Sequence, residues 1–183
     1  ATAIDATDLS AIGAKTSGAV TVTNAVVISG TTAQVTAALV TTASLVVAAT
    51  ATGTISDAAG TAIDATDLSA IGAKTSGAVT VTNAVTISGT QAELTAAIVT
   101  SASLVVAATA NLTISDNISI AQANTHDGNS TGVVTATITS DTAANLTGST
   151  INDANSNNDI DLAVTALQST LAADLSGLST TSG

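Results

Sequence analysis

The chain has 183 residues, and 45% of them are hydrophobic, yet Phe, Trp, Tyr, Met, Cys and Pro are all missing. Thirteen acidic residues against two lysines, with no arginine, give a net charge of −11. This charge excludes nucleic-acid binding, which needs a basic face, and disfavours anionic membrane surfaces. Without cysteine the chain has neither disulfides nor thiolate metal sites. No apolar run approaches the ~18 residues of a membrane span, so we expect no membrane insertion.

The apolar residues are restricted to Ala, Val, Ile and Leu, which limits the core that they can build. None of these side chains fills a wide gap between layers, so we expect thin layers of backbone instead of a thick globule. Disorder is disfavoured, because mean hydropathy is +0.54 and only 8% of the residues are charged.

The sequence repeats itself. Residues 2–26 (TAIDATDLSAIGAKTSGAVTVTNAV) return unchanged as residues 61–85, and residues 2–60 differ from residues 61–119 at 11 of 59 positions. Small tripeptides that end in glycine recur at residues 16–18, 75–77, 130–132 and 181–183. They divide one continuous array into a partial repeat (1–18), repeat 1 (19–77), repeat 2 (78–132) and a diverged repeat 3 (133–183). We expect a window of a longer array, because both ends resemble interior repeats.

Short helices are expected where capping residues precede apolar positions at helical spacing. Acidic residues favour the positive end of a helix dipole, and we interpret five of them as lying at helix starts: Asp5, Asp8, Asp64, Asp67 and Asp141. Lys15 and Lys74 follow the same helices, where cations are favoured. Residues 31–34 (TTAQ) and 90–93 (TQAE) have the pattern of capping boxes. Leucines at 167, 171, 175 and 178 form a helical stripe in the last repeat.

Alternating strands are expected between these helices. Val79, Val81, Val85 and Ile87 alternate with polar residues, apart from an interruption near residues 83–84. Each repeat then splits into two coils of strand, short helix and turn. The predicted fold is therefore a repeat solenoid of stacked parallel β-strands with a short helix or helical turn per coil. The alternative is a pure right-handed β-helix in which the short helices are turns.

Three stretches resemble repeats of very large secreted bacterial surface proteins: residues 6–22 (ATDLSAIGAKTSGAVTV), 86–98 (TISGTQAELTAAI) and 138–148 (ITSDTAANLTG). These proteins are described as hemolysin-type or adhesin-like and are frequent in cyanobacteria and marine proteobacteria. The resemblance implies an extracellular stalk, fibre or surface layer, often with calcium. The glycine-rich calcium-binding nonapeptide of many such proteins is absent here, so the resemblance assigns no calcium ligands to this chain.

Catalysis has little support in the sequence. The one histidine, His126, lies among Asn, Gly and Ser residues typical of an exposed turn, so we interpret it as a solvated loop residue instead of a triad base. Polysaccharide cleavage would need a basic cleft and aromatic platforms, and the chain has no Arg and no aromatic residue. We therefore expect no enzyme.

Calcium is the one cofactor that the sequence suggests. Asp153, Asn155, Asn157 and Asp159 have the alternating spacing that brings oxygens round a hard cation. The pattern is incomplete, because Asn158 replaces the usual glycine and Val164 replaces the final glutamate. An Asx-rich turn without metal is the alternative interpretation.

The sequence favours an extracellular, cell-surface structural protein that forms a rod, filament or S-layer by stacking and end-to-end association. Its expected partners are copies of itself, with glycans or a cell surface as further contacts. The alternative is an adhesin or ice-binding module that uses a flat face of threonines such as Thr21, Thr23, Thr80 and Thr82.

The calcium hypothesis predicts a chelator-sensitive fold. If the site exists, adding calcium raises the melting temperature of the chain and EDTA lowers it, because a ligand that binds only the folded state stabilises that state. Differential scanning calorimetry checks this. Identical melting curves in calcium and in EDTA would remove the site.

Overall fold

The computed structural model describes residues 2–100, 105–141 and 159–164. The described strands are β1 (Ala3–Asp5), β2 (Val20–Thr21), β3 (Val27–Gly30), β4 (Val46–Val47), β5 (Thr52–Ile55), β6 (Ala62–Asp64), β7 (Val79–Val81), β8 (Thr86–Gly89), β9 (Val105–Val106), β10 (Asn111–Ile118), β11 (Val134–Asp141) and β12 (Asp159–Val164). The described helices are α1 (Ala6–Gly13), α2 (Thr32–Leu39), α3 (Ala65–Gly72), α4 (Gln91–Leu94) and α5 (Ile120–Asp127), with a 3₁₀ turn at Thr42–Ser44 and a π-helical turn at Thr95–Val99.

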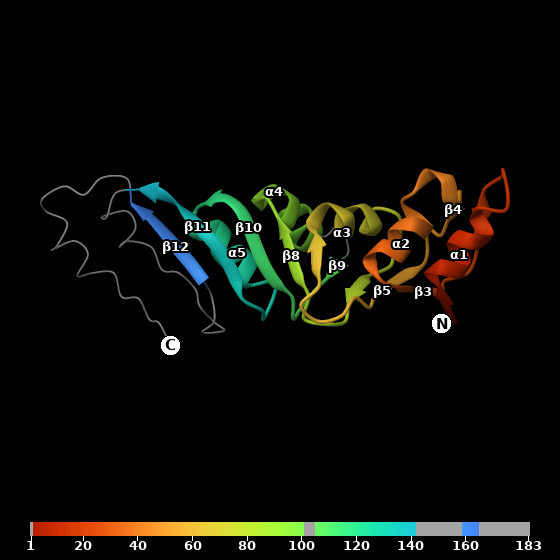
Figure 1. Cartoon of the computed structure of the whole chain (residues 1–183), viewed down its shortest axis with the longest axis horizontal. Helices are drawn as coiled ribbons and strands as arrows, with labels where there is room; N and C mark the ends of the chain where they lie inside the picture. The colour runs from red at the N-terminus through yellow and green to blue at the C-terminus, as the bar shows by residue number, and fades with distance from the viewer. Residues whose placement is uncertain (1, 101–104, 142–158, 165–183) are drawn as a thin grey trace, which may run out of the picture.

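In the described ranges the strands form three sheets, and every pairing between them is parallel. The strand orders are β1-β3-β5-β7-β9, β12-β11-β10-β8-β6 and β2-β4. Figure 1 shows an elongated arrangement in which β1 lies near one end and β12 toward the other. Helices α1, α2, α3 and α4 follow one another along its length, and each packs against the next.

The predicted repeat solenoid is wrong, and so is the pure right-handed β-helix. The described residues form an α/β arrangement of three parallel sheets with five α-helices. Strands that the repeat makes equivalent lie in different sheets: β3 joins β1 and β5, whereas its counterpart β8 joins β6 and β10. Most of the helices run for eight residues, which is too long for the turns of a β-helix. The two copies therefore make equivalent pairings, but within separate sheets.

Capping explains where the helices begin. The predicted capping boxes are confirmed: Thr31 and Gln34 satisfy each other's backbone amides at the start of α2, and Thr90 and Glu93 do the same at α4. Asp5 and its counterpart Asp64 are confirmed as N-caps of α1 and α3. A third box, at Ser119, was not predicted.

The core lies between the helices and the sheets. Its large buried apolar side chains are all aliphatic. Ile28, Leu68, Ile87 and Leu112 are fully buried in it. Val85 and Ile87 are buried on either side of half-buried Thr86, which agrees with the predicted alternation. No helix in the described part of the chain is long and apolar enough to cross a membrane.

Two identical residues offer a direct test of this packing. Ile71 in α3 is fully buried, whereas its counterpart Ile12 in α1 is 55% exposed. We expect Ile71→Ala to lower the free energy of unfolding by about 2–5 kcal/mol, as buried Ile to Ala changes do. Ile12→Ala should change it by less than about 1 kcal/mol, because little apolar area is lost from the interior. Urea denaturation of both variants checks this, and equal losses would contradict the described burial.

Candidate functional site

Two of the tripeptides that end in glycine, at residues 75–77 and 130–132, lie close against an earlier stretch of backbone. Before β7, the amide of Ser76 donates to the carbonyl oxygen of Ala49 at 2.8 Å, and the amide of Gly53 donates to that of Ala78 at 2.9 Å. The Thr75 hydroxyl donates to the carbonyl oxygen of Ala51. A Cβ on Gly77 would overlap this same oxygen. We call this contact, between residues 49–53 and residues 75–78, the glycine joint.

The glycine joint recurs in the next repeat despite divergence of the sequence. There the amide of Thr131 donates to Ala108 O at 2.7 Å, and the amide of Leu112 donates to Val133 O at 2.8 Å. The Ser130 hydroxyl donates to Ala110 O, and a Cβ on Gly132 would overlap that oxygen. The same backbone geometry therefore recurs in repeats 1 and 2.

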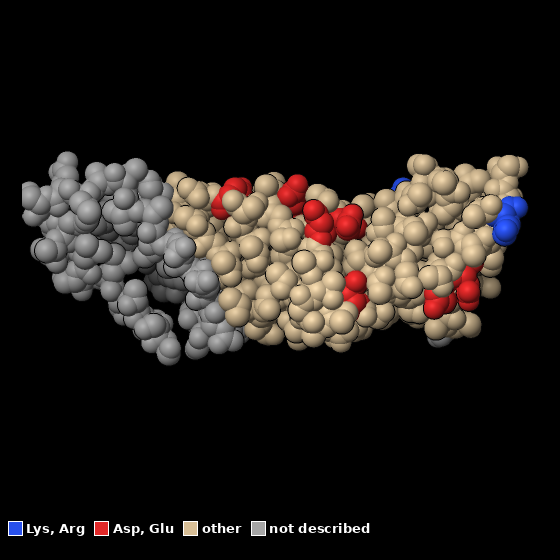
Figure 2. Space-filling model, viewed as in Figure 1, with Lys and Arg blue, Asp and Glu red and all other residues tan. Residues whose placement is uncertain are grey.

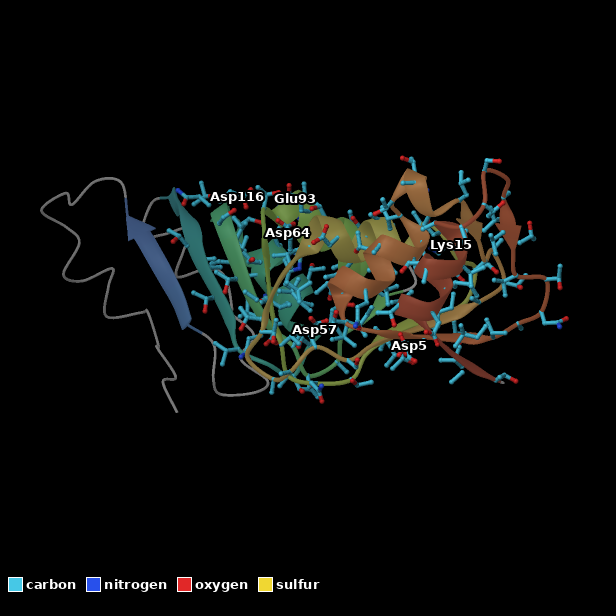
Figure 3. The ribbon with its side chains drawn as sticks, turned by 45° about the vertical axis from the view of Figure 1, so that its right-hand side comes forward. Asp5, Lys15, Asp57, Asp64, Glu93 and Asp116 are labelled. Atoms are coloured by element: carbon cyan, nitrogen blue, oxygen red, sulfur yellow. The ribbon has the colours of Figure 1, made fainter. Side chains whose placement is uncertain are left out.

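Acidic side chains gather at the helix starts, where they are used as hydrogen-bond acceptors. Asp57 Oδ2 accepts from the amide and the hydroxyl of Thr32, the first residue of α2, at 2.6 and 2.7 Å. Its counterpart Asp116 accepts from the amide of Gln91, the first residue of α4, at 2.7 Å. Figure 3 shows Asp116 and Glu93 on one side of the molecule, and Figure 2 shows the acidic side chains of the visible face in separate small groups. Asp57, Glu93 and Asp116 each accept a hydrogen bond at a helix start.

The cross-strand caps at Asp57 and Asp116 were not predicted from the sequence. Each carboxylate lies 25 residues beyond the first residue of the helix that it caps, so no local pattern marks it. The sequence contained one signal that could have indicated these caps. A Ser-Asp pair follows β5, and the same pair recurs in β10 at the repeat spacing. The pKa values of Asp5 and Asp64 are lowered, because Thr7 and Thr66 donate hydrogen bonds to their carboxylates.

The predicted calcium ligands are not brought together by anything that the structure describes. Asp153, Asn155 and Asn157 lie outside the described residues, and Asp159 begins β12 without a described side chain. Among the described residues, no group of three or more His, Asp or Glu side chains could hold a metal ion. The calcium hypothesis stays a prediction from the sequence.

The interpretation of His126 as a solvated loop residue is wrong. His126 lies in the last turn of α5 and is fully buried, and among the described residues neither ring nitrogen has a hydrogen-bond partner. The apolar side of α5 packs on β10 and β11 and draws the imidazole into the core. The hydroxyl of Ser130, four residues later, donates to the carbonyl oxygen of Ala110 in the glycine joint.

Burial also sets the protonation of His126. Its pKa is lowered because the core penalises the charged imidazolium, and the negative charge of Asp116 opposes this effect. The side chain is therefore a neutral, buried histidine. It lacks the partners that a general base needs on both sides.

Comparison of the chain with protein-family models, with curated proteins and with solved structures found no match.

His126 should make folding sensitive to mild acid. Because its pKa is lower in the folded state, the unfolded chain binds more protons below about pH 6.5, so stability falls from pH 7 toward pH 5. His126→Leu should remove this slope. It should also leave stability at pH 7 unchanged or raise it by about 1 kcal/mol, since a buried unpaired polar group is lost. Thermal melts of both proteins at several pH values check this, and an unaltered slope in the variant would contradict it.

Proposed function

We propose that this chain is an extracellular structural protein whose repeats build a rod, fibre or surface layer. The observation that carries the proposal is the glycine joint, which recurs with the same hydrogen bonds at the end of repeat 1 and at the end of repeat 2. Because the glycine joint consists of backbone atoms and a glycine, the surrounding side chains can change without breaking it. Repeat 2 keeps the joint although its sequence has diverged. Such a joint suits a protein whose task is to extend itself.

The surface and the core support a mechanical role. Parallel backbone pairing continues along the elongated arrangement of Figure 1, so a pulling force meets many hydrogen bonds instead of one weak contact. The acidic residues lie at helix starts and give the surface a net negative charge, which opposes nonspecific aggregation. The proposal assigns the chain no catalytic role.

A binding role as an adhesin or ice-binding module is the second candidate, and one observation favours it. Ser29, Thr54 and Thr80 lie side by side in register across β3, β5 and β7. The same register places Asp5 at one end of this row and Val106 at the other, so the row of hydroxyls is short. Thermal hysteresis or glycan-array binding by the purified chain would favour this candidate over the structural one.

The structural proposal predicts where the protein is found. Antibodies raised against the chain should label the outside of intact source cells in immunogold electron microscopy, along filaments or as a continuous layer. Serum absorbed with purified chain provides the control. Label that requires permeabilised cells would overturn the proposal.

A further inference from the structure

The tripeptides that end in glycine show that α5 has the same place in its repeat as α1 and α3. Each of these helices has eight residues and ends five residues before its glycine. His126 lies six residues before Gly132, as Ile71 lies six residues before Gly77. Ile12 has the same place in α1. An imidazole therefore occupies the helical position at which both earlier copies have isoleucine.

This exchange changes how the helix is anchored. The large side chains that anchor α3 are Leu68 and Ile71, and both are fully buried. The side chains that α5 buries are those of Ala123, His126 and Asp127. One methyl group and two ionisable side chains bury less apolar area than a leucine and an isoleucine do. Detaching α5 from the sheets should therefore cost less free energy than detaching α3.

The surroundings of His126 offer little to a positive charge. α5 packs on β10, on β11 and on the π-helical turn at Thr95–Val99, and the buried side chains of these three elements are all apolar. The π-helical turn has no ionisable residue, and β11 has only Asp141, at its last position. β10 has Asp116, which is exposed and already caps α4. On α5 itself the ionisable neighbour is Asp127.

We propose that α5 is an acid-released helix, which leaves the sheet when His126 takes up a proton while the strands beneath it stay paired. At neutral pH the uncharged imidazole fills the position of the isoleucine, and α5 covers β10 and β11. An imidazolium is more stable in water than among apolar side chains, so protonation favours the released helix. The inference goes beyond the proposed function and does not rest on it.

The release is local because the strands have attachments of their own. β10 pairs with β8 on one side and with β11 on the other. The glycine joint holds residues 131–133, which follow α5, against residues 108–112. Residues 119–129 can therefore detach between two fixed points. Their detachment uncovers part of the apolar face of β10 and β11.

The equilibrium between the covering and the released helix depends on pH in one direction. In the released helix the pKa of His126 is the ordinary value of about 6.5. Burial lowers the pKa of His126 in the covering helix. Below about pH 6.5 only the released helix gains a proton, so its population rises by up to about tenfold per pH unit until the buried imidazole also titrates.

Hydrogen exchange of the wild-type chain, followed by mass spectrometry, tests the release. The protection of the α5 amides is corrected for the intrinsic exchange rate at each pH and compared with the global unfolding equilibrium from urea denaturation at the same pH. At pH 5 the α5 amides should be at least about tenfold less protected than global unfolding requires. Their protection should fall about tenfold or more between pH 7 and pH 5. In His126→Ile, which restores the residue of the earlier copies, this fall should disappear.

Thiol accessibility gives a second measurement, since the chain has no cysteine of its own. Ala123→Cys places a thiol on the buried side of α5, and Ala121→Cys places one on the exposed side. Both react with 4,4′-dithiodipyridine, and the ratio of the two rates cancels the effect of pH on the thiol itself. The relative rate of Ala123→Cys should rise about tenfold or more between pH 7 and pH 5. Adding His126→Ile to both variants should remove the rise.

Loss of α5 protection that exceeds global unfolding and disappears in His126→Ile supports the acid-released helix. Protection of α5 that equals the value set by global unfolding at both pH values overturns it, and so does a fall that persists in His126→Ile. A relative rate of Ala123→Cys that stays constant between pH 7 and pH 5 also overturns it. His126→Leu serves as a second uncharged variant if His126→Ile does not fold.

Discussion

The arrangement depends on one contact, in which a backbone carbonyl oxygen lies directly against a glycine. Gly77 meets Ala51 O, and Gly132 meets Ala110 O, at the points where a new strand enters beside an older one. Any Cβ there would push the strands apart and break the amide bonds on either side. The position of each repeat relative to the previous one is therefore set by backbone geometry, which explains how repeat 2 keeps the joint with a different flanking sequence.

The helices attach to this framework through their first turns. Local boxes such as Thr31 with Gln34 satisfy some of the free amides, and Asp57 satisfies another from the neighbouring strand. Aliphatic side chains of moderate size then fill the thin space beneath. The carboxylate of Asp57 caps a helix and is therefore already bonded within the protein. Other acidic residues also lie at helix starts, dispersed along the chain.

Local features could be predicted from the sequence, because they depend on neighbouring residues. The capping boxes at Thr31 and Thr90, the caps at Asp5 and Asp64 and the alternation around Ile87 are of this kind. The division into separate sheets could not be predicted, because β3 and its counterpart β8 make equivalent pairings and no residue of either strand marks the sheet to which it belongs. His126 was misjudged for a related reason: its polar neighbours in sequence are typical of a turn, but burial follows from how α5 packs on strands that come before and after it.

The cross-strand caps also impose a direction on folding. The first amide of α2 is completed by Asp57, and that of α4 by Asp116, each 25 residues later in the chain. As the chain emerges from its N-terminal end, α2 and α4 wait for a carboxylate that has not yet arrived, whereas α1, α3 and α5 carry caps that precede them. The first turns of α2 and α4 are therefore completed only after the following strand has been made. A chain built in this way can be delivered gradually without having to fold all at once.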